Sequence, residues 1–220
     1  MHPVNTRRIL AALYRLEFER IRERYPNRPE PRRIKKFILR AQDLWLDRSP
    51  PLHILDLGCG AGYFLCICRF FGHEGTGLDT DDWPLYREIT ALLNVRRVIS
   101  RIEPQVPLPD LSERFDLVTA IRVCFYLKGW PQNVPGNEWT PADWTFFLND
   151  IRTRFLKPGG RLFLEFNPRP DDSSFFTPQL RECFLAQGAR IFRSKALFAA
   201  YPTERARFKQ TRPRNSTVSS

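Results

Sequence analysis

Residues 53–201 alternate short apolar segments with amphipathic ones, and this alternation restricts the possible folds more than any other feature of the chain. Strands are expected at 53–57, 75–78, 97–100, 115–123 and 161–166, with one or two more in 189–201. Helices are expected at 63–71, 84–93, 140–155 and 177–188. Because such an order favours parallel strands joined by crossover helices, the sequence predicts an α/β fold. We expect a three-layer sandwich with a mainly parallel, doubly wound sheet.

The amino-terminal region is predicted to be helical. Residues 5–25 carry apolar side chains at nearly helical spacing, at Ile9, Leu10, Leu13, Leu16 and Ile21. A second amphipathic helix is expected over 33–46. We therefore expect three parts: an amino-terminal helical extension or lid at 1–49, a ligand-binding domain at 50–201, and a basic, disordered tail at 202–220.

The helix expected at 140–155 has well-defined end signals. Thr140 is a suitable amino-terminal cap, Pro141 suits the first turn, and the Asp143 carboxylate suits the positive end of the helix. Apolar side chains then repeat at helical spacing up to Phe155. The segment Lys157-Pro158-Gly159-Gly160 is expected to end the helix and turn into the next strand.

Composition indicates a soluble globular protein. Hydrophobic residues make up 42% of the chain, but no apolar stretch approaches the roughly 20 residues that span a bilayer. The amino terminus has no signal-peptide core, so a cytoplasmic protein without a membrane partner is expected. The five cysteines match no zinc pattern and the three histidines are scattered, so we expect reduced thiols and no metal site.

Positive charge is concentrated at both ends of the chain. Residues 1–49 hold 13 basic and 6 acidic side chains, and residues 190–220 hold 8 basic and 1 acidic, within a total net charge of +11. Such ends attract anionic partners over a long range, so nucleic acid is a possible partner. The alternative interpretation is ordinary solvated helix faces and a loose tail.

A glycine-rich bend follows the first strand of the alternating region. It reads Asp56-Leu57-Gly58-Cys59-Gly60-Ala61-Gly62, and a helix is expected directly after it. Glycines let the backbone turn sharply and approach a ligand, and the helix directs its free N–H groups toward the same place. Ligands of doubly wound sheets bind at this edge, so we expect a binding site here. The spacing G-x-G-x-G differs from the G-x-G-x-x-G of dinucleotide enzymes.

Four segments together resemble the class I (Rossmann-like) S-adenosylmethionine-dependent methyltransferases. They are ILDLGCGAGYF at Ile54–Phe64, GTGLD ending at Asp79, FDLVTA from Phe115, and LKPGGRLFLEF at Leu156–Phe166. Their order and spacing also agree with that family, over about residues 50–190. The resemblance implies a Rossmann-like fold, S-adenosyl-L-methionine as the cofactor of domain 50–201, and methyl transfer as the activity, in a bacterial-type small-molecule branch.

The resemblance also implies roles for particular residues. The bend formed by Gly58, Cys59, Gly60 and Gly62 would lie against the methionine and ribose parts of the cofactor, and Asp56 would brace it and reach the cofactor's amino group. Asp79 would accept hydrogen bonds from the ribose hydroxyls. The remaining cofactor contacts would come from Thr80 and Ile102 at the adenine and from Ala120 and Ile121 at the methionine. Arg101 departs from the family pattern, in which an acidic residue is common at this place.

The methyl acceptor is less defined by sequence. The candidates for binding it are Arg122, Tyr126, Trp130 and Trp139. Arg122 either holds a carboxylate or phosphate or is simply an ion-paired arginine, and the tryptophans either line the site or belong to the core. No histidine follows the fourth strand, so no general base is assigned. The N/D-P-P-Y/F/W tetrapeptide of related amine methyltransferases is absent after Ala120, which argues against exocyclic base amines as acceptors.

Three functions are therefore considered. The first is methyl transfer to a small molecule with anionic or aromatic character. The second is methylation of RNA or the ribosome, with the basic ends as docking surfaces. The third is a non-catalytic protein that binds the cofactor and transfers nothing.

Overall fold

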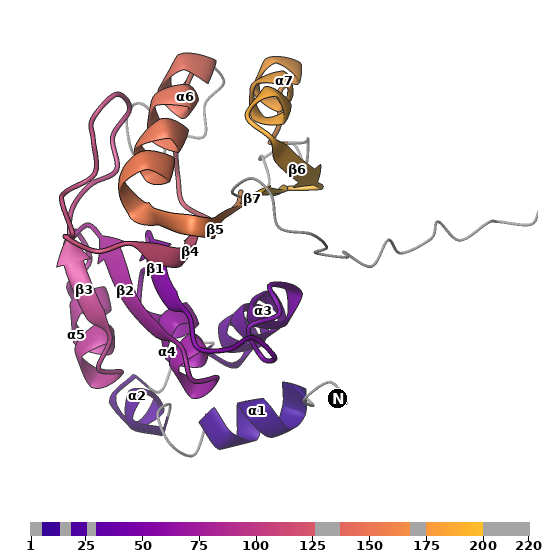
Figure 1. Ribbon diagram of the computed structural model, residues 1–220. Coiled ribbons are helices and arrows are strands. Elements are labelled where there is room, and N and C mark those ends of the chain that lie inside the picture. The colour runs from indigo at the N-terminus through magenta and orange to yellow at the C-terminus, as the bar shows by residue number, and fades with distance from the viewer. Residues whose placement is uncertain (1–5, 14–18, 26–29, 126–136, 168–174, 200–220) are drawn as a thin grey trace, which may run out of the picture.

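The computed structural model describes residues 6–13, 19–25, 30–125, 137–167 and 175–199 (Figure 1). Within these ranges, seven strands form one sheet in the order β3-β2-β1-β4-β5-β7-β6. Their bounds are β1 His53–Leu57, β2 Glu74–Asp79, β3 Arg96–Ile99, β4 Phe115–Ile121, β5 Leu156–Glu165, β6 Ala189–Phe192 and β7 Lys195–Ala199. Strands β1 to β5 pair in parallel, whereas β7 is antiparallel to both β5 and β6. The predicted mainly parallel, doubly wound sheet is confirmed.

The direction of winding reverses beside β1. From β1 the chain passes outward through β2 to β3, and it then returns to β4 on the other side of β1. Leu57, at the end of β1, is in register with Leu78 of β2 and with Ala120 of β4. The carboxyl ends of three neighbouring strands therefore meet at one edge, which is where doubly wound sheets bind ligands.

Helices cover both faces of this sheet (Figure 1). One face carries α1 Thr6–Leu13, α2 Glu19–Arg24, α3 Glu30–Asp43, α4 Tyr63–Phe70 and α5 Pro84–Leu92. The other carries α6 Pro141–Asp150, a π-helical turn at Ile151–Phe155, and α7 Pro178–Ala186. Each face has its own cluster of buried apolar side chains, so the molecule has the three layers that the sequence predicts.

The amino-terminal helices share a core with the sheet. Ile21, Ile34 and Ile38 are fully buried in the same cluster as Ile54 of β1 and Phe64 of α4.

The helix predicted over 5–25 corresponds to α1 and α2, and the residues between them, 14–18, lie outside the described ranges. The helix predicted over 33–46 corresponds to α3, which begins three residues earlier.

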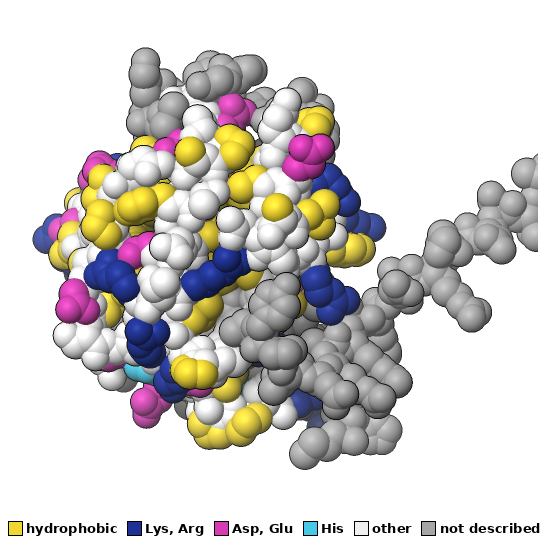
Figure 2. Space-filling model, turned by 45° about the horizontal axis from the view of Figure 1, so that its top comes forward, with side chains coloured by type: hydrophobic (Ala, Val, Ile, Leu, Met, Phe, Trp, Pro, Cys, Tyr) yellow, Lys and Arg dark blue, Asp and Glu magenta, His cyan; other side chains and the backbone are white. Residues whose placement is uncertain are grey.

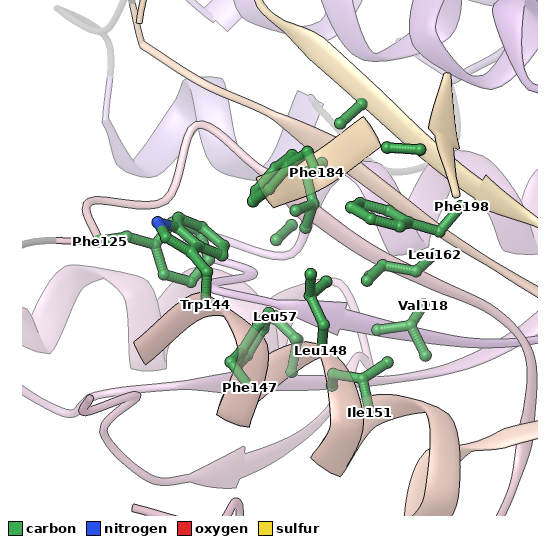
Figure 3. Packing of buried hydrophobic residues seen from close by; sticks show 14 of the residues in the cluster. Leu57, Val118, Phe125, Trp144, Phe147, Leu148, Ile151, Leu162, Phe184 and Phe198 are labelled. Atoms are coloured by element: carbon green, nitrogen blue, oxygen red, sulfur yellow. The ribbon is translucent and has the colours of Figure 1, made fainter. Parts of the chain in front are cut away.

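Helix α6 begins as its sequence predicts. The Thr140 side chain accepts a hydrogen bond from Asp143 N, and the Asp143 carboxylate accepts one from Thr140 N, which together form a capping box. Figure 3 shows Trp144, Phe147 and Leu148 of α6 in the cluster that contains Leu57, Val118 and Leu162 of the sheet. The predicted apolar repeat thus lies on the buried side of the helix, although its last turn, from Ile151, is π-helical.

Strand β5 begins earlier than predicted. The sequence suggested a turn at Lys157–Gly160, but Leu156 already pairs with Phe115 of β4. The register then shifts, because the next pair joins Leu117 to Arg161. Gly159, with a φ of +78°, lies inside this irregular part. The prolines and glycines that resemble a turn therefore belong to a bulge, which a sequence pattern does not distinguish from a strand boundary.

No helix in the described ranges has both the length and the apolar character needed to cross a membrane. In those same ranges, histidine, cysteine and acidic side chains do not form a group that could hold a metal ion. All the cysteines are described, and each is a free thiol.

Candidate functional site

The glycine bend lies where the carboxyl ends of β1, β2 and β4 meet. Gly58 N donates to Leu78 O of β2 at 2.7 Å. A Cβ placed on Gly58 would lie only 2.5 Å from Val123 Cγ2, just after β4, and the φ of Gly58 is +65°. Only a residue without a side chain fits here, because both the space and the left-handed backbone exclude one. The bend is therefore held tightly between its two neighbouring strands.

Asp79 is joined to this bend by hydrogen bonds. One of its carboxylate oxygens accepts from Gly60 N and the other accepts from Thr80 N at 2.7 Å. Gly60 and Asp79 are 19 residues apart in the sequence, so the fold alone brings them together. Each carboxylate oxygen has further lone pairs and can still accept hydrogen bonds from a ligand hydroxyl.

Asp56 lies below the bend in a different environment. Its side chain is buried at 3% exposure, and its Oδ1 accepts a hydrogen bond from Thr119 Oγ1 at 2.6 Å. Burial raises the pKa of Asp56 to about 7, and the nearby Asp79 charge adds to this rise although the Thr119 hydroxyl opposes it. Asp56 thus changes its charge near neutral pH.

Thr119 is a residue that sequence reasoning missed. It lies in FDLVTA, directly before Ala120, and it is in register with Asp56 across β1 and β4. The pair depends on the register of β1 against β4, which neither motif specifies by itself.

Helix α4 begins directly after the bend, so its amino-terminal end lies beside it. Its cap is Gly62, which supplies no side-chain hydrogen bond, and its first turn contains no acidic residue. The positive end of the helix dipole therefore lies beside the bend with no acidic side chain of the first turn to neutralise it. Together with the Asp79 carboxylate, this end of the helix fits the cofactor that the sequence resemblance implies, which carries both hydroxyl groups and a carboxylate.

The other predicted cofactor residues differ in burial and in the face of the sheet against which they pack. Ala120 is fully buried at the end of β4, and Ile121 is half-buried on the opposite face of the sheet, toward α3 and α4. Ile102, after β3, packs against the cluster under α6. The Cys59 thiol lies toward Gly77 of β2, where an added Cβ would be 2.5 Å from its sulfur. Burial raises the pKa of this thiol, so it stays a neutral thiol packed against β2.

Arg122 follows β4 and is ion-paired. Its Nε lies 3.8 Å from Glu165 Oε1 at the end of β5, and 46% of its side chain is exposed. Glu165 is buried, and Arg40 of α3 donates to both of its carboxylate oxygens. Sequence reasoning gave no sign of Arg40 or Glu165, because charged residues on a helix and at a strand end usually face solvent.

Trp139 belongs to a group of packed aromatic rings, of which Figure 3 labels Phe125, Trp144 and Phe147. The Trp139 ring centroid lies 4.9 Å from that of Phe125 and 5.2 Å from that of Trp144. Its side chain is 4% exposed, yet its Nε1 has no hydrogen-bond partner. Trp139 is therefore a core residue with an unused donor. The other two candidates, Tyr126 and Trp130, lie outside the described residues.

Charges of both signs are mixed on the described surface that Figure 2 shows. Lys and Arg side chains, in dark blue, are interspersed with Asp and Glu side chains, in magenta. The excess of basic residues in the sequence belongs largely to the two ends of the chain, and much of these ends falls outside the described ranges.

Comparison with known proteins gives one family. The family described as "Methyltransferase domain" matches residues 22–197. No curated protein is significantly similar to this chain.

Solved structures with a related fold share little sequence with the chain. A Nostoc punctiforme protein provisionally described as an O-methyltransferase is 20% identical, with a TM-score of 0.46, over 64% of this chain and 40% of that one. A glycopeptide N-methyltransferase with bound S-adenosyl-L-methionine is 20% identical, with a TM-score of 0.41, over 58% and 53%. A Pyrococcus horikoshii OT3 protein is 21% identical, with a TM-score of 0.46, over 79% and 69%. The chain spans about half the length or less of the first two, and none of these likenesses extends to a substrate.

Proposed function

The chain belongs to the methyltransferase-domain family, whose class I members use S-adenosyl-L-methionine, and on this premise we propose that it transfers a methyl group from that cofactor to a small molecule. The observation that carries the proposal is the contact between Gly60 N and the Asp79 carboxylate. It joins the two parts of the sequence that the family uses for the nucleoside, at the edge of the sheet where ligands bind.

The residues that the resemblance assigns would hold the cofactor as follows. The backbone of Gly58 to Gly60 would support the methionine and ribose parts, and Asp79 would accept hydrogen bonds from the ribose hydroxyls. Thr80 and Ile102 would lie at the adenine, and the chain at Ala120 and Ile121 would pass close to the methionine. When bound, S-adenosylmethionine supplies an electrophilic methyl group on a sulfonium.

The protein's contribution to the reaction is alignment and exclusion of water. Of the two described histidines, His53 begins β1 and His73 precedes β2, so both lie at the amino ends of the strands, away from the site. Holding two reactants in line can supply a large part of a displacement's rate. The bend suits this purpose, because the contacts of Gly58 with Leu78 and Val123 hold it rigidly.

Labelling tests the proposal directly. The protein is incubated with methyl-labelled S-adenosylmethionine and a metabolite extract, and S-adenosylhomocysteine is measured with and without the extract. We expect extract-dependent accumulation and a labelled small molecule. Binding of the cofactor without any turnover would instead favour the non-catalytic alternative.

Methylation of RNA or the ribosome is the second candidate, and the basic ends of the chain support it. Electrostatic binding to RNA weakens steeply as salt is added, because counterions compete for the phosphates. A filter-binding titration at several salt concentrations tests this candidate. No binding at low salt would exclude it.

A further inference from the structure

Five charged side chains meet at the carboxyl end of β5, on the face that α3 covers. Arg40 Nη2 donates to Glu165 Oε1 at 2.8 Å, and Arg122 Nε lies 3.8 Å from the same oxygen. Lys195 Nζ lies 3.1 Å from Asp43 Oδ2, and Arg40 also pairs with Asp43. Three cations thus share two carboxylates, so the group carries an excess positive charge.

Of the three cations in this group, Arg122 is the one whose positive charge is least compensated by the two carboxylates. Arg40 binds both oxygens of Glu165, and the two side chains are only 15% and 5% exposed, so they form a closed pair. The distance from Arg122 to Glu165 is too long for a hydrogen bond, and the Arg122 side chain is 46% exposed. Glu165 therefore attracts Arg122 only through a long ion pair, and the Arg122 guanidinium keeps its donors for another anion.

The backbone at Arg122 is strained and is held in that state. Its φ is +61°, which costs an ordinary residue energy that glycine would not incur. Arg122 N donates to Glu165 O at 2.6 Å, and Arg122 O accepts from Asn167 Nδ2 at 3.0 Å. Of the six described non-glycine residues with positive φ, only Arg122 directly follows a strand in the middle of the sheet. The next residue, Val123, contacts the glycine bend at Gly58.

We propose that Arg122 binds an anionic group, a carboxylate or a phosphate, on the methyl acceptor. This inference rests on the proposed function, since it assigns the acceptor to the side of the cofactor where β4 and β5 end. A planar guanidinium binds either group through paired, charge-assisted hydrogen bonds. The Arg40–Glu165 pair is a positioning element that fixes Arg122 but does not touch the acceptor.

Binding of simple aromatic probes tests the inference. Calorimetry first measures the binding of S-adenosylhomocysteine to the protein. The protein saturated with this compound is then titrated separately with benzoate, phenyl phosphate and the neutral benzamide. We expect at least one anion to bind about tenfold or more tightly than benzamide, as a charge-assisted contact provides. The anion that binds with the higher affinity shows whether the acceptor carries a carboxylate or a phosphate.

The decisive variant is Arg122→Gly. Glycine adopts the positive φ without strain, so thermal stability should be kept or raised while the preference for anions is lost. Arg96→Gln is the matched control: it removes the same charge from a 59% exposed side chain at the opposite edge of the sheet and should leave the preference intact.

Arg40→Gln tests the positioning role. Without Arg40, Glu165 pairs with Arg122 and cancels its charge, so the ratio of anion to benzamide affinity should fall about as far as in Arg122→Gly. The affinity for S-adenosylhomocysteine should stay unchanged, and Arg40→Lys should restore part of the ratio. A merely structural role would leave the ratio unaltered.

The outcomes separate the two proposals. If S-adenosylhomocysteine binds but neither anion binds at millimolar concentration, or if Arg122→Gly keeps the preference, the inference is wrong and the proposed function stands. If S-adenosylhomocysteine itself does not bind, both proposals fail.

Discussion

Among single residues, the two aspartates of the site lie in contrasting environments. Asp56 is buried and accepts a hydrogen bond from one hydroxyl, whereas Asp79 is half-buried and held by two backbone N–H groups. Burial disfavours a charge on Asp56 and raises its pKa, whereas the half-buried Asp79 is accessible to a ligand. The two carboxyl groups can therefore take different roles within one site.

Replacing Asp79 tests its contact with the ribose. Asp79→Ala should weaken S-adenosylhomocysteine binding by about 1 to 3 kcal/mol, the usual effect of losing hydrogen bonds to a charged acceptor. Calorimetry measures the change, and Asp110→Ala, an exposed aspartate between β3 and β4, is the control. An affinity equal to that of the unaltered protein would refute the role of Asp79.

Replacing Asp56 should reveal its raised pKa. The unfolded chain releases this proton near the ordinary pKa of 3.8, whereas the folded chain releases it at about 7. The free energy of unfolding therefore decreases as pH rises between these values and is level above them. Asp56→Asn has no carboxyl group to ionise at this position, so its free energy of unfolding should not fall in this way. The stability of the variant relative to the unaltered protein should therefore rise by on the order of 3 kcal/mol between pH 4 and pH 8.

Denaturant unfolding at several pH values, without cofactor, measures this difference. A stability difference between Asp56→Asn and the unaltered protein that stays constant with pH would contradict the assignment.

Among structural elements, the glycine bend depends on both space and backbone conformation. Gly58 and Gly159 both have positive φ, but a Cβ on Gly159 would meet nothing within 4 Å, whereas one on Gly58 would overlap Val123. Gly159→Ala should therefore cost about 1 kcal/mol of stability from the backbone alone. Gly58→Ala should cost about 2 to 4 kcal/mol and also weaken cofactor binding, because the bend must move.

Thermal unfolding and calorimetry of the two variants separate these effects. Equal losses in both variants would show that the close approach of Val123 has no importance for the bend.

At the scale of the whole molecule, the amino-terminal helices are part of the core. Leu13 of α1, Ile21 of α2 and Ile38 of α3 are buried in the cluster that also contains Leu117 and Phe163 of the sheet. Removing residues 1–49 would expose this face, and each large apolar side chain contributes about 1.5 to 3 kcal/mol when buried. The shortened chain should show no cooperative thermal transition. A stable shortened protein would indicate that the helices act only as the lid considered from the sequence.

Much of the fold could be predicted because its signals are local. The apolar segment His53–Leu57, the cap at Thr140 and the glycines after Leu57 each act within a few residues, so pattern alone located β1, α6 and the bend. Prediction was weaker at β5, where Lys157–Gly160 resembles a turn. Only pairing with β4 shows that these residues form a bulge within the strand.

By itself the sequence determined the family and the parallel sheet and located the glycine bend, because glycine spacing and strand alternation are properties of short segments. Tertiary structure alone decided that Thr119 contacts Asp56 and that Arg40 closes on Glu165, 125 residues away. It likewise decided that Trp139 is buried without a hydrogen-bond partner. These contacts depend on which strands become neighbours and in which register, and burial then sets the charge and hydrogen bonding of each group. Such long-range pairing leaves no mark in the local pattern of residues.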